Sequence, residues 1–245
     1  MLRAWIEQPL RAGATSVTLS EEESGHLVRS LRARRGDTVV LLDGDGLVAE
    51  GRLASADGEA ARVELLKVSR APAPAPVIVL AQSMPKGGTM DDLVRSAAEA
   101  GVSEIQPLAT ARCEVRLDAE RGAAKSARWR DRAIEACKQC GNPWLARIGT
   151  PTRFLDWIDS LPALVAGEVR LTASLEIDAI PVAQIGLSEA TRVTWLVGPE
   201  GDFTPEELAA ARHAGFRPVS LGHLTLRSET AALACVIATQ VLARR

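Results

Sequence analysis

The sequence predicts an α/β protein with a small N-terminal β-barrel domain and a larger domain of alternating strands and helices. Short β-type runs separated by glycine-containing turns precede residue 70, and apolar runs alternate with helical segments after residue 77. Between them, residues 71–76 read APAPAP, in which proline fixes φ and removes backbone donors. We therefore expect domains at residues 1–70 and 77–245, joined by a linker at residues 71–76.

The expected strands of the N-terminal domain are residues 16–19, 38–42, 47–53 and 61–68. Turn signals separate them, for example the Asp57-Gly58 pair. After the first strand, Ser20 can cap a helix with an acidic first turn, and Leu27 and Leu31 follow at helical spacing. If this helix continues, Arg29 and Arg32 share one of its faces.

In the C-terminal domain we expect strands at residues 77–82, 104–108, 163–166 and 193–197. Helices are expected at residues 89–100, 119–141 and 228–243, with others beginning near Asp178 and Thr204. This alternation predicts a mostly parallel sheet with helices on both faces. Thr204, Pro205 and Glu207 form a capping-box signature. Residues 198–203 therefore form a loop between a buried strand and a helix, where α/β proteins bind ligands.

Composition is that of a soluble globular protein, with 47% hydrophobic and 24% charged residues. There is no apolar run of the length that a signal peptide or membrane span requires, so we expect a cytoplasmic protein with no membrane partner. The net charge of -2 argues against indiscriminate nucleic-acid binding, although basic residues cluster locally. One such cluster is Arg29, Arg32, Arg34 and Arg35.

Glycine-containing loops are the candidate ligand sites. No dinucleotide-binding or P-loop motif is present, but Gly198, Gly201 and Gly222 lie in two strand-end loops that each precede a helix. Together these loops would let backbone groups approach a planar ligand such as adenine. Either loop alone is better explained as an ordinary strand-to-helix turn. Cys137 and Cys140 have metal-type spacing but no second pair, so we expect a helix there and no metal.

Two C-terminal motifs carry a family resemblance. LVGPEGDFTPEEL at residues 196–208, followed by SLGHLTLRSETAALAC at residues 220–235, resembles the paired signature of the RsmE family in the knotted SPOUT superfamily of methyltransferases. Residues 25–46, 84–108 and 128–143 fit the same family, so the resemblance covers nearly the whole chain.

The resemblance implies a PUA-like RNA-binding barrel and a methyltransferase domain whose last helix passes through a loop to form a trefoil knot. Members use S-adenosylmethionine to methylate N3 of a uridine in 16S ribosomal RNA of the small ribosomal subunit, and they act as homodimers. By motif, the cofactor-binding positions are Gly198, Glu200, Gly201, Leu221, Gly222, Leu224 and Leu226.

The sequence departs from the family pattern at three informative positions. Asp202 stands where the last glycine of GPEGG is usual, and Asn142 stands where an arginine is common. Ser228 replaces threonine and keeps a hydroxyl that could cap the terminal helix.

Methyl transfer to N3 requires loss of the N3 proton. We hypothesise that Arg227 stabilises negative charge on a uracil carbonyl while Glu229 or a water accepts the proton. The alternative is that Arg227 pairs structurally with Glu229 or Glu200. For RNA phosphates, the candidates are Arg29, Arg32, Lys86 and Arg112, which could instead be ordinary exposed charges.

Two other functions compete with this interpretation. One is a related knotted methyltransferase that acts on transfer RNA or on a ribose 2′-hydroxyl. The other is a non-catalytic RNA-binding homologue, in which Asp202 and Asn142 mark a decayed site.

Overall fold

The computed structural model describes residues 1–8, 10, 13–113 and 119–243, with the backbone alone at residues 119–120. The chain forms two compact units, one of Met1–Ala73 with Ile134–Leu145 and one of Pro74–Ala133 with Ala146–Arg245. The boundary falls within the proline-rich segment. Residues 134–145 were expected in the C-terminal domain, but Ile134 and Cys137 pack against Trp5, Val40 and Leu42 of the first unit.

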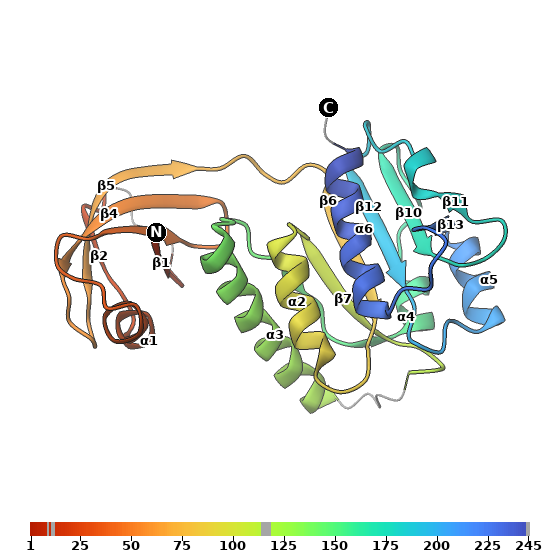
Figure 1. The fold of residues 1–245 in the computed structure, drawn as a ribbon, viewed down its shortest axis with the longest axis horizontal. Coiled ribbons are helices and arrows are strands. Elements are labelled where there is room, and N and C mark those ends of the chain that lie inside the picture. The colour runs from red at the N-terminus through yellow and green to blue at the C-terminus, as the bar shows by residue number, and fades with distance from the viewer. Residues whose placement is uncertain (9, 11–12, 114–118, 244–245) are drawn as a thin grey trace. The chain divides into compact units, whose positions relative to one another are not determined.

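The first unit contains a five-stranded sheet (Figure 1). In the order β1-β3-β4-β5-β2, its strands are Leu2–Trp5, Thr38–Leu42, Leu47–Ser55, Arg62–Arg70 and Ser16–Thr18. The β1–β3 pairing is parallel and the others are antiparallel. The predicted β-rich domain is confirmed, although β1 was not predicted. Among the described residues, no pairing joins the two edge strands β1 and β2.

Helix α1 (Glu21–Gly25) begins as predicted, because the Ser20 side chain accepts a hydrogen bond from the backbone N–H of Glu23. It continues as a π-helical turn, η1 (His26–Ser30), in which Leu27 is buried. Arg32 has φ of 57°, so it lies beyond the end of the helix. The expectation that Arg29 and Arg32 share a helix face is therefore wrong.

A buried ion pair joins α1 to the last turn of α3 (Ala119–Cys140) within the first unit. Lys138 Nζ lies 2.6 Å from Glu23 Oε1, and the backbone N–H of Trp5 donates to Glu23 Oε2 at 2.9 Å. Burial lowers the pKa of Lys138, but hydrogen bonds to Glu135 and Glu23 outweigh burial and hold that pKa above its ordinary value. The lysine therefore stays charged in the interior.

The second unit is built on a parallel sheet in which every pairing of the described strands is parallel. The sheet order is β11-β13-β10-β12-β6-β7-β8, and β9 also pairs with β7. In chain order β6 to β13 are Val77–Ser83, Glu104–Ala109, Arg147–Ile148, Thr152–Arg153, Glu168–Ala173, Ile180–Pro181, Arg192–Val197 and Arg217–Ser220. The predicted parallel sheet is confirmed.

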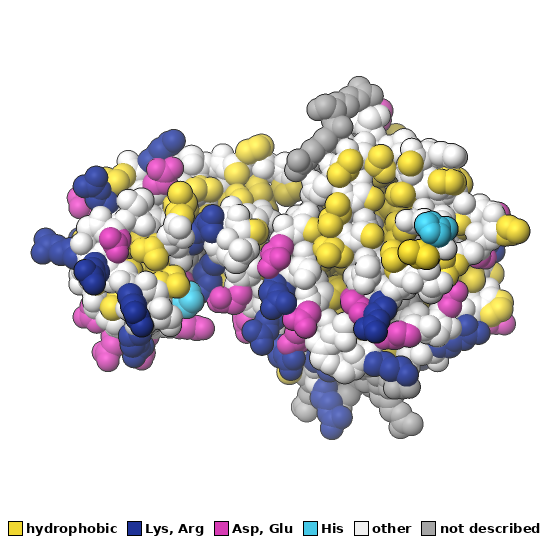
Figure 2. Space-filling view, viewed as in Figure 1, with side chains coloured by type: hydrophobic (Ala, Val, Ile, Leu, Met, Phe, Trp, Pro, Cys, Tyr) yellow, Lys and Arg dark blue, Asp and Glu magenta, His cyan; other side chains and the backbone are white. Residues whose placement is uncertain are grey.

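Helices cover both faces of this sheet, as predicted (Figure 1). On one face lie α2 (Thr89–Glu99) and α6 (Ser228–Leu242), and Trp195 Nε1 of β12 donates to Thr239 Oγ1 of α6 at 2.8 Å. On the other lie α4 (Phe154–Asp159) and α5 (Pro205–His213), whose core cluster includes Leu196 of β12. Exposed hydrophobic side chains gather over the face that α6 occupies (Figure 2).

Within the described part of the chain, no helix is both long enough and apolar enough to cross a membrane.

Two predicted elements are wrong. Residues 163–166 form no strand; they follow Pro162, Val165 is exposed, and the strand is β10, which begins at Glu168. No α-helix begins near Asp178, where the exposed Ile177 precedes β11 and a short 3-10 turn, η2 (Val182–Gln184). Pro181 has no N–H to donate to a preceding helical turn.

The buried ion pair yields a stability prediction. Lys138→Ala is expected to lower the free energy of unfolding by about 3 kcal/mol, because it leaves the buried carboxylate of Glu23 without its cation. Denaturant unfolding measures this difference. Lys67→Ala, which removes an exposed lysine of the same unit, should cost about 0.5 kcal/mol or less. Equal losses in the two variants would contradict a stabilising role for the pair.

Candidate functional site

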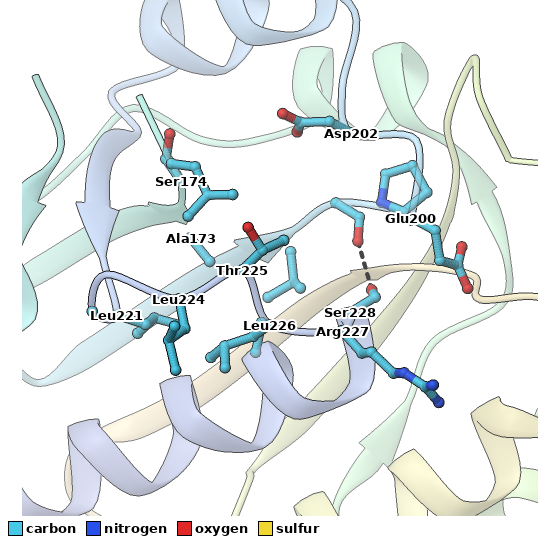
Figure 3. Close-up of a pocket in the computed structure, with 16 residues that line it drawn as sticks. Ala173, Ser174, Glu200, Asp202, Leu221, Leu224, Thr225, Leu226, Arg227 and Ser228 are labelled. Carbon is cyan, nitrogen blue, oxygen red and sulfur yellow. Dashed lines mark hydrogen bonds between the residues drawn. The ribbon is translucent and has the colours of Figure 1, made fainter. Parts of the chain in front are cut away.

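A cavity of about 340 Å³ lies at the carboxyl ends of the central strands (Figure 3). This edge of a parallel sheet is where α/β proteins bind ligands. The end of β10, the loop after β12, the loop after β13 and the start of α6 line it. The lining residues are Ala173, Ser174, Leu175, Val197, Gly198, Pro199, Glu200, Asp202, Leu221, Gly222, Leu224, Thr225, Leu226, Arg227, Ser228 and Ala231.

The loop after β12 is held in a turn by Asp202. The backbone N–H of Asp202 donates to the carbonyl of Pro199 at 3.0 Å, and Asp202 Oδ1 accepts from the N–H of Phe203 at 2.7 Å. Asp202 has φ of 60°, a left-handed conformation that glycine adopts freely and that aspartate tolerates better than most residues. Asp202 therefore takes up a backbone conformation suited to the glycine that the family usually has here.

The same loop is anchored where α5 begins. Thr204 Oγ1 accepts from the N–H of Glu207, and Glu207 Oε2 accepts from the N–H of Thr204, which confirms the predicted capping box. Phe203, just before the cap, is buried against Phe154 with the ring centroids 5.5 Å apart. The loop thus runs between a buried strand and a fixed helix start.

Arg112, a predicted RNA contact, also holds this loop. Its guanidinium donates to the carbonyl of Gly201 at 2.7 Å and to that of Phe203 at 3.2 Å. Beside it, the N–H of Ala111 donates to Glu207 Oε1 at 2.7 Å. The segment after β7 is therefore tied to the loop after β12, and RNA binding by Arg112 stays a prediction.

The loop after β13 depends on a glycine conformation. Gly222 has φ of 138°, a value that residues with a Cβ rarely adopt. Ser220 Oγ donates to the carbonyl of Gly222 at 3.0 Å and accepts from its N–H at 3.3 Å. The loop then contributes Leu224 and Leu226 to the cavity before α6 begins. The trefoil knot itself stays a prediction.

Ser228 does not cap α6, contrary to the prediction. The N-cap residue is Arg227, and no side-chain hydrogen bond caps the helix. The Ser228 hydroxyl instead donates to the carbonyl of Gly198 at 2.6 Å (Figure 3). The same hydroxyl accepts from Gln82 Nε2 at 2.8 Å. Its hydroxyl therefore joins the start of α6 to the end of β12.

The structure brings most of the predicted site residues together. All predicted cofactor positions except Gly201 line the cavity: Gly198, Glu200, Leu221, Gly222, Leu224 and Leu226. Gly201 lies in the same loop outside the lining. Residues 173–175 were not predicted, because the strand before them was expected at residues 163–166, too early in the chain. A correct boundary for β10 would have shown that its carboxyl end adjoins the same edge of the sheet.

Of the two predicted catalytic residues, Arg227 lines the cavity and Glu229 does not. The Arg227 side chain is exposed, and it forms no ion pair with any residue that the structure describes, so the alternative pairing with Glu229 or Glu200 is not observed. In Figure 3 the Arg227 and Glu200 side chains extend on the same side of the loops, away from Leu221. Glu229 is half-buried in the first turn of α6.

The remaining candidates lie outside the cavity. Arg29 and Arg32 are exposed in the first unit, and Lys86 is exposed in the second. Cys137 and Cys140 lie in α3, as predicted for a helix. Burial, together with the nearby Cys140, raises the pKa of the Cys137 thiol to about 12, so this thiol stays protonated at neutral pH.

Comparison with known proteins identifies the family. Residues 72–240 match the family model described as an RNA methyltransferase domain, and residues 19–66 match an RNA methyltransferase PUA domain. The ribosomal RNA small subunit methyltransferase E of Synechocystis sp. is 32% identical over 223 residues, covering 88% of this chain and 70% of the relative. That of Mycobacterium tuberculosis is 31% identical over 241 residues, covering 95% and 88%.

Two solved structures resemble the chain over nearly its whole length. A ribosomal RNA small subunit methyltransferase E from Neisseria gonorrhoeae, bound to S-adenosyl methionine, has a TM-score of 0.87 and 31% identity and covers 99% of this chain and 98% of that one. A methyltransferase from Legionella pneumophila, in complex with the same cofactor, has a TM-score of 0.87 and 28% identity, covering 98% and 97%. The chain therefore belongs to the RsmE family of RNA methyltransferases.

Proposed function

We propose that this protein transfers a methyl group from S-adenosylmethionine to N3 of a uridine in 16S ribosomal RNA, in the cytoplasm. The cavity formed by the loops after β12 and β13 carries the proposal, because these loops contain the family's paired motifs. Two solved relatives of similar fold hold S-adenosylmethionine. The small-subunit names of the curated relatives support ribosomal RNA as the substrate class.

The chemistry of the cavity fits this cofactor. Its leucines offer an apolar surface for a planar base, and its two glycine-containing loops let backbone groups approach closely. Glu200 and Asp202 are the acidic residues of the lining, and their carboxylates complement a ligand that carries a sulfonium and an ammonium group. When bound, S-adenosylmethionine supplies an activated methyl group, so the protein's own task is to position the uracil and manage its N3 proton.

Arg227 is the residue placed to stabilise negative charge on the uracil. It lies at the cavity, its guanidinium is exposed, and it has no carboxylate partner among the described residues. A cation beside a uracil carbonyl favours the anion that forms as N3 loses its proton. Glu229 lies two residues further along the chain, and it or a water next to it accepts that proton.

Asp202 and Asn142, two of the departures from the family pattern, are compatible with an active enzyme. Asp202 keeps a left-handed turn, so the loop forms without the usual glycine. Asn142 Oδ1 accepts from the N–H of Trp144 at 3.0 Å and so has a structural role of its own. These observations favour the enzyme over the non-catalytic RNA-binding homologue.

For RNA, we assign phosphate contacts to Arg29 and Arg32 of the first unit and to Lys86 and Arg112 of the second. All four residues are exposed, as phosphate contacts must be. The match of residues 19–66 to an RNA methyltransferase PUA domain supports a role for the first unit in RNA binding.

A homodimer is part of the proposal. Ile237 and Val241 are exposed one turn apart on α6, and Leu224 and Leu226 are exposed in the loop that precedes this helix. Exposed hydrophobic side chains that gather on one face mark an interaction site in soluble proteins (Figure 2). A second copy of the chain would cover this face next to the cavity.

Arg227→Ala is expected to lower the methylation rate at saturating cofactor by about 100-fold, since one preorganised electrostatic group is lost from the transition state. Its affinity for S-adenosylmethionine should stay near that of the wild type. Steady-state kinetics and calorimetry measure the two quantities. Arg217→Ala, which removes an exposed arginine at the start of β13, serves as the matched control. Full methylation by the Arg227 variant would end the proposed role.

Replacing both Arg29 and Arg32 by glutamine should flatten the salt dependence of RNA binding, by roughly 0.7 to 0.9 in log–log slope per lost phosphate contact. Filter binding at several salt concentrations measures that slope. Arg153→Gln removes an exposed arginine of the other unit and should leave the slope unchanged. An unaltered slope in the double variant would rule out the two phosphate contacts.

Ile237→Asp is expected to convert a dimer, with twice the chain mass of 26.0 kDa, into a monomer, because it buries a charge in the interface. Light scattering after size exclusion measures the mass. The matched control is Leu155→Asp on α4, since Leu155 is 51% exposed and Ile237 is 48% exposed. Equal effects of the two substitutions, or a monomeric wild type, would refute the α6 interface.

The reaction itself is tested by mapping methylated bases in ribosomal RNA from a strain that lacks the gene. We expect one N3-methyluridine of 16S ribosomal RNA to disappear and to return when purified protein and S-adenosylmethionine are added. Assembled small subunits should be methylated faster than free RNA. A missing methyl group on transfer RNA or on a ribose would instead establish the competing knotted-enzyme function.

A further inference from the structure

We infer that Ser228 is a positioning residue that sets the spacing between the two loops of the cavity, an inference that rests on the proposed function. Its hydroxyl donates to the Gly198 carbonyl at 2.6 Å. It also accepts from Gln82 Nε2 at 2.8 Å. A hydroxyl has a single proton to donate, so that proton is committed to Gly198.

Gln82 holds the hydroxyl in this orientation. It is fully buried at the end of β6, and its Nε2 also donates to the carbonyl of Ser83 at 2.7 Å. A flipped amide would place an oxygen against that carbonyl, so the observed orientation is the favourable one. The Oε1 atom has no hydrogen-bond partner among the described residues. A buried acceptor left unpaired is costly, which indicates that the donor side of the amide determines its placement.

The polar row continues into the neighbouring strand. Ser83 Oγ and Thr110 Oγ1 share a hydrogen bond of 2.7 Å, and both residues are buried. Buried polar groups therefore run from the end of β7, through β6, to the first residue of α6. The row reaches the cavity through Ser228, which lines the cavity together with Gly198.

The hydrogen bond from Ser228 to Gly198 joins the start of the loop after β12 to the end of the loop after β13. Gly198 is the first residue after β12, and Ser228 is the first residue after the loop that follows β13. Fixing the Gly198 carbonyl also fixes the peptide before Pro199, which has no N–H of its own to anchor. Without this bond the loops must be brought together when the cofactor binds, and that ordering lowers its affinity.

The test is calorimetric titration of S-adenosylmethionine into wild type, Ser228→Ala, Ser228→Thr and Gln82→Met. We expect the dissociation constant to rise about tenfold in Ser228→Ala, the scale of one lost hydrogen bond. Gln82→Met should give a smaller rise, about threefold, because the hydroxyl keeps its bond to Gly198. Ser228→Thr retains the hydroxyl and should bind as the wild type does. In steady-state assays the Ser228→Ala change should appear in KM for the cofactor, with kcat nearly unchanged.

Thr239→Val is the matched control, since Thr239 is a buried hydroxyl on the same helix with the same bonding pattern. Its Oγ1 accepts from Trp195 and donates to the carbonyl of Cys235 at 2.9 Å. It lies 11 residues beyond Ser228, roughly 16 Å along the helix. Thr239→Val should lower thermal stability at least as much as Ser228→Ala while leaving cofactor affinity unchanged.

Equal affinities in Ser228→Ala and wild type, or equal losses in Ser228→Ala and Thr239→Val, would overturn the positioning role. Failure of the wild type to bind the cofactor would refute the proposed function as well, so the two failures are distinguishable.

Discussion

The structure of the second unit depends on the burial of β12 on both faces at the centre of the parallel sheet. Trp195 points to α6 and hydrogen-bonds Thr239, whereas Leu196 points to the core beneath α4 and α5. Strands β10 and β6 flank β12 within the sheet, and helices cover both faces of the sheet. The carboxyl end of β12 therefore has little conformational freedom. The loop that begins at Gly198 therefore starts from a fixed point, and α6 returns to the same point through Ser228.

Local signals explain what could be predicted from the sequence. The capping box at Thr204 and the acidic turn after Ser20 are short-range patterns, and both helix starts lie where they predicted. The parallel sheet followed from alternation of apolar and helical segments. The strand at residues 163–166 was wrong because a short apolar run beside Pro162 resembles a buried strand, although only the surrounding structure decides its exposure.

Tertiary contacts explain what could not be predicted. Nothing near Ser228 in the sequence indicates a bond to Gly198, which is 30 residues earlier, and a serine at a helix start is normally read as a cap. The grouping of residues 134–145 with the first unit likewise depends on side chains such as Trp5, which are distant in the sequence. The two family motifs contain most of the residues that line the cavity, whereas the end of β10 carried no motif and was missed.

The proposed function requires the loops after β12 and β13 to hold the adenosyl cofactor between them. A crystal structure of the protein with S-adenosylhomocysteine would locate the ligand. We expect the adenosyl group between residues 198–202 and 221–226, with its base in contact with backbone atoms of both segments. Density for the ligand at any other place on the chain would refute this binding site.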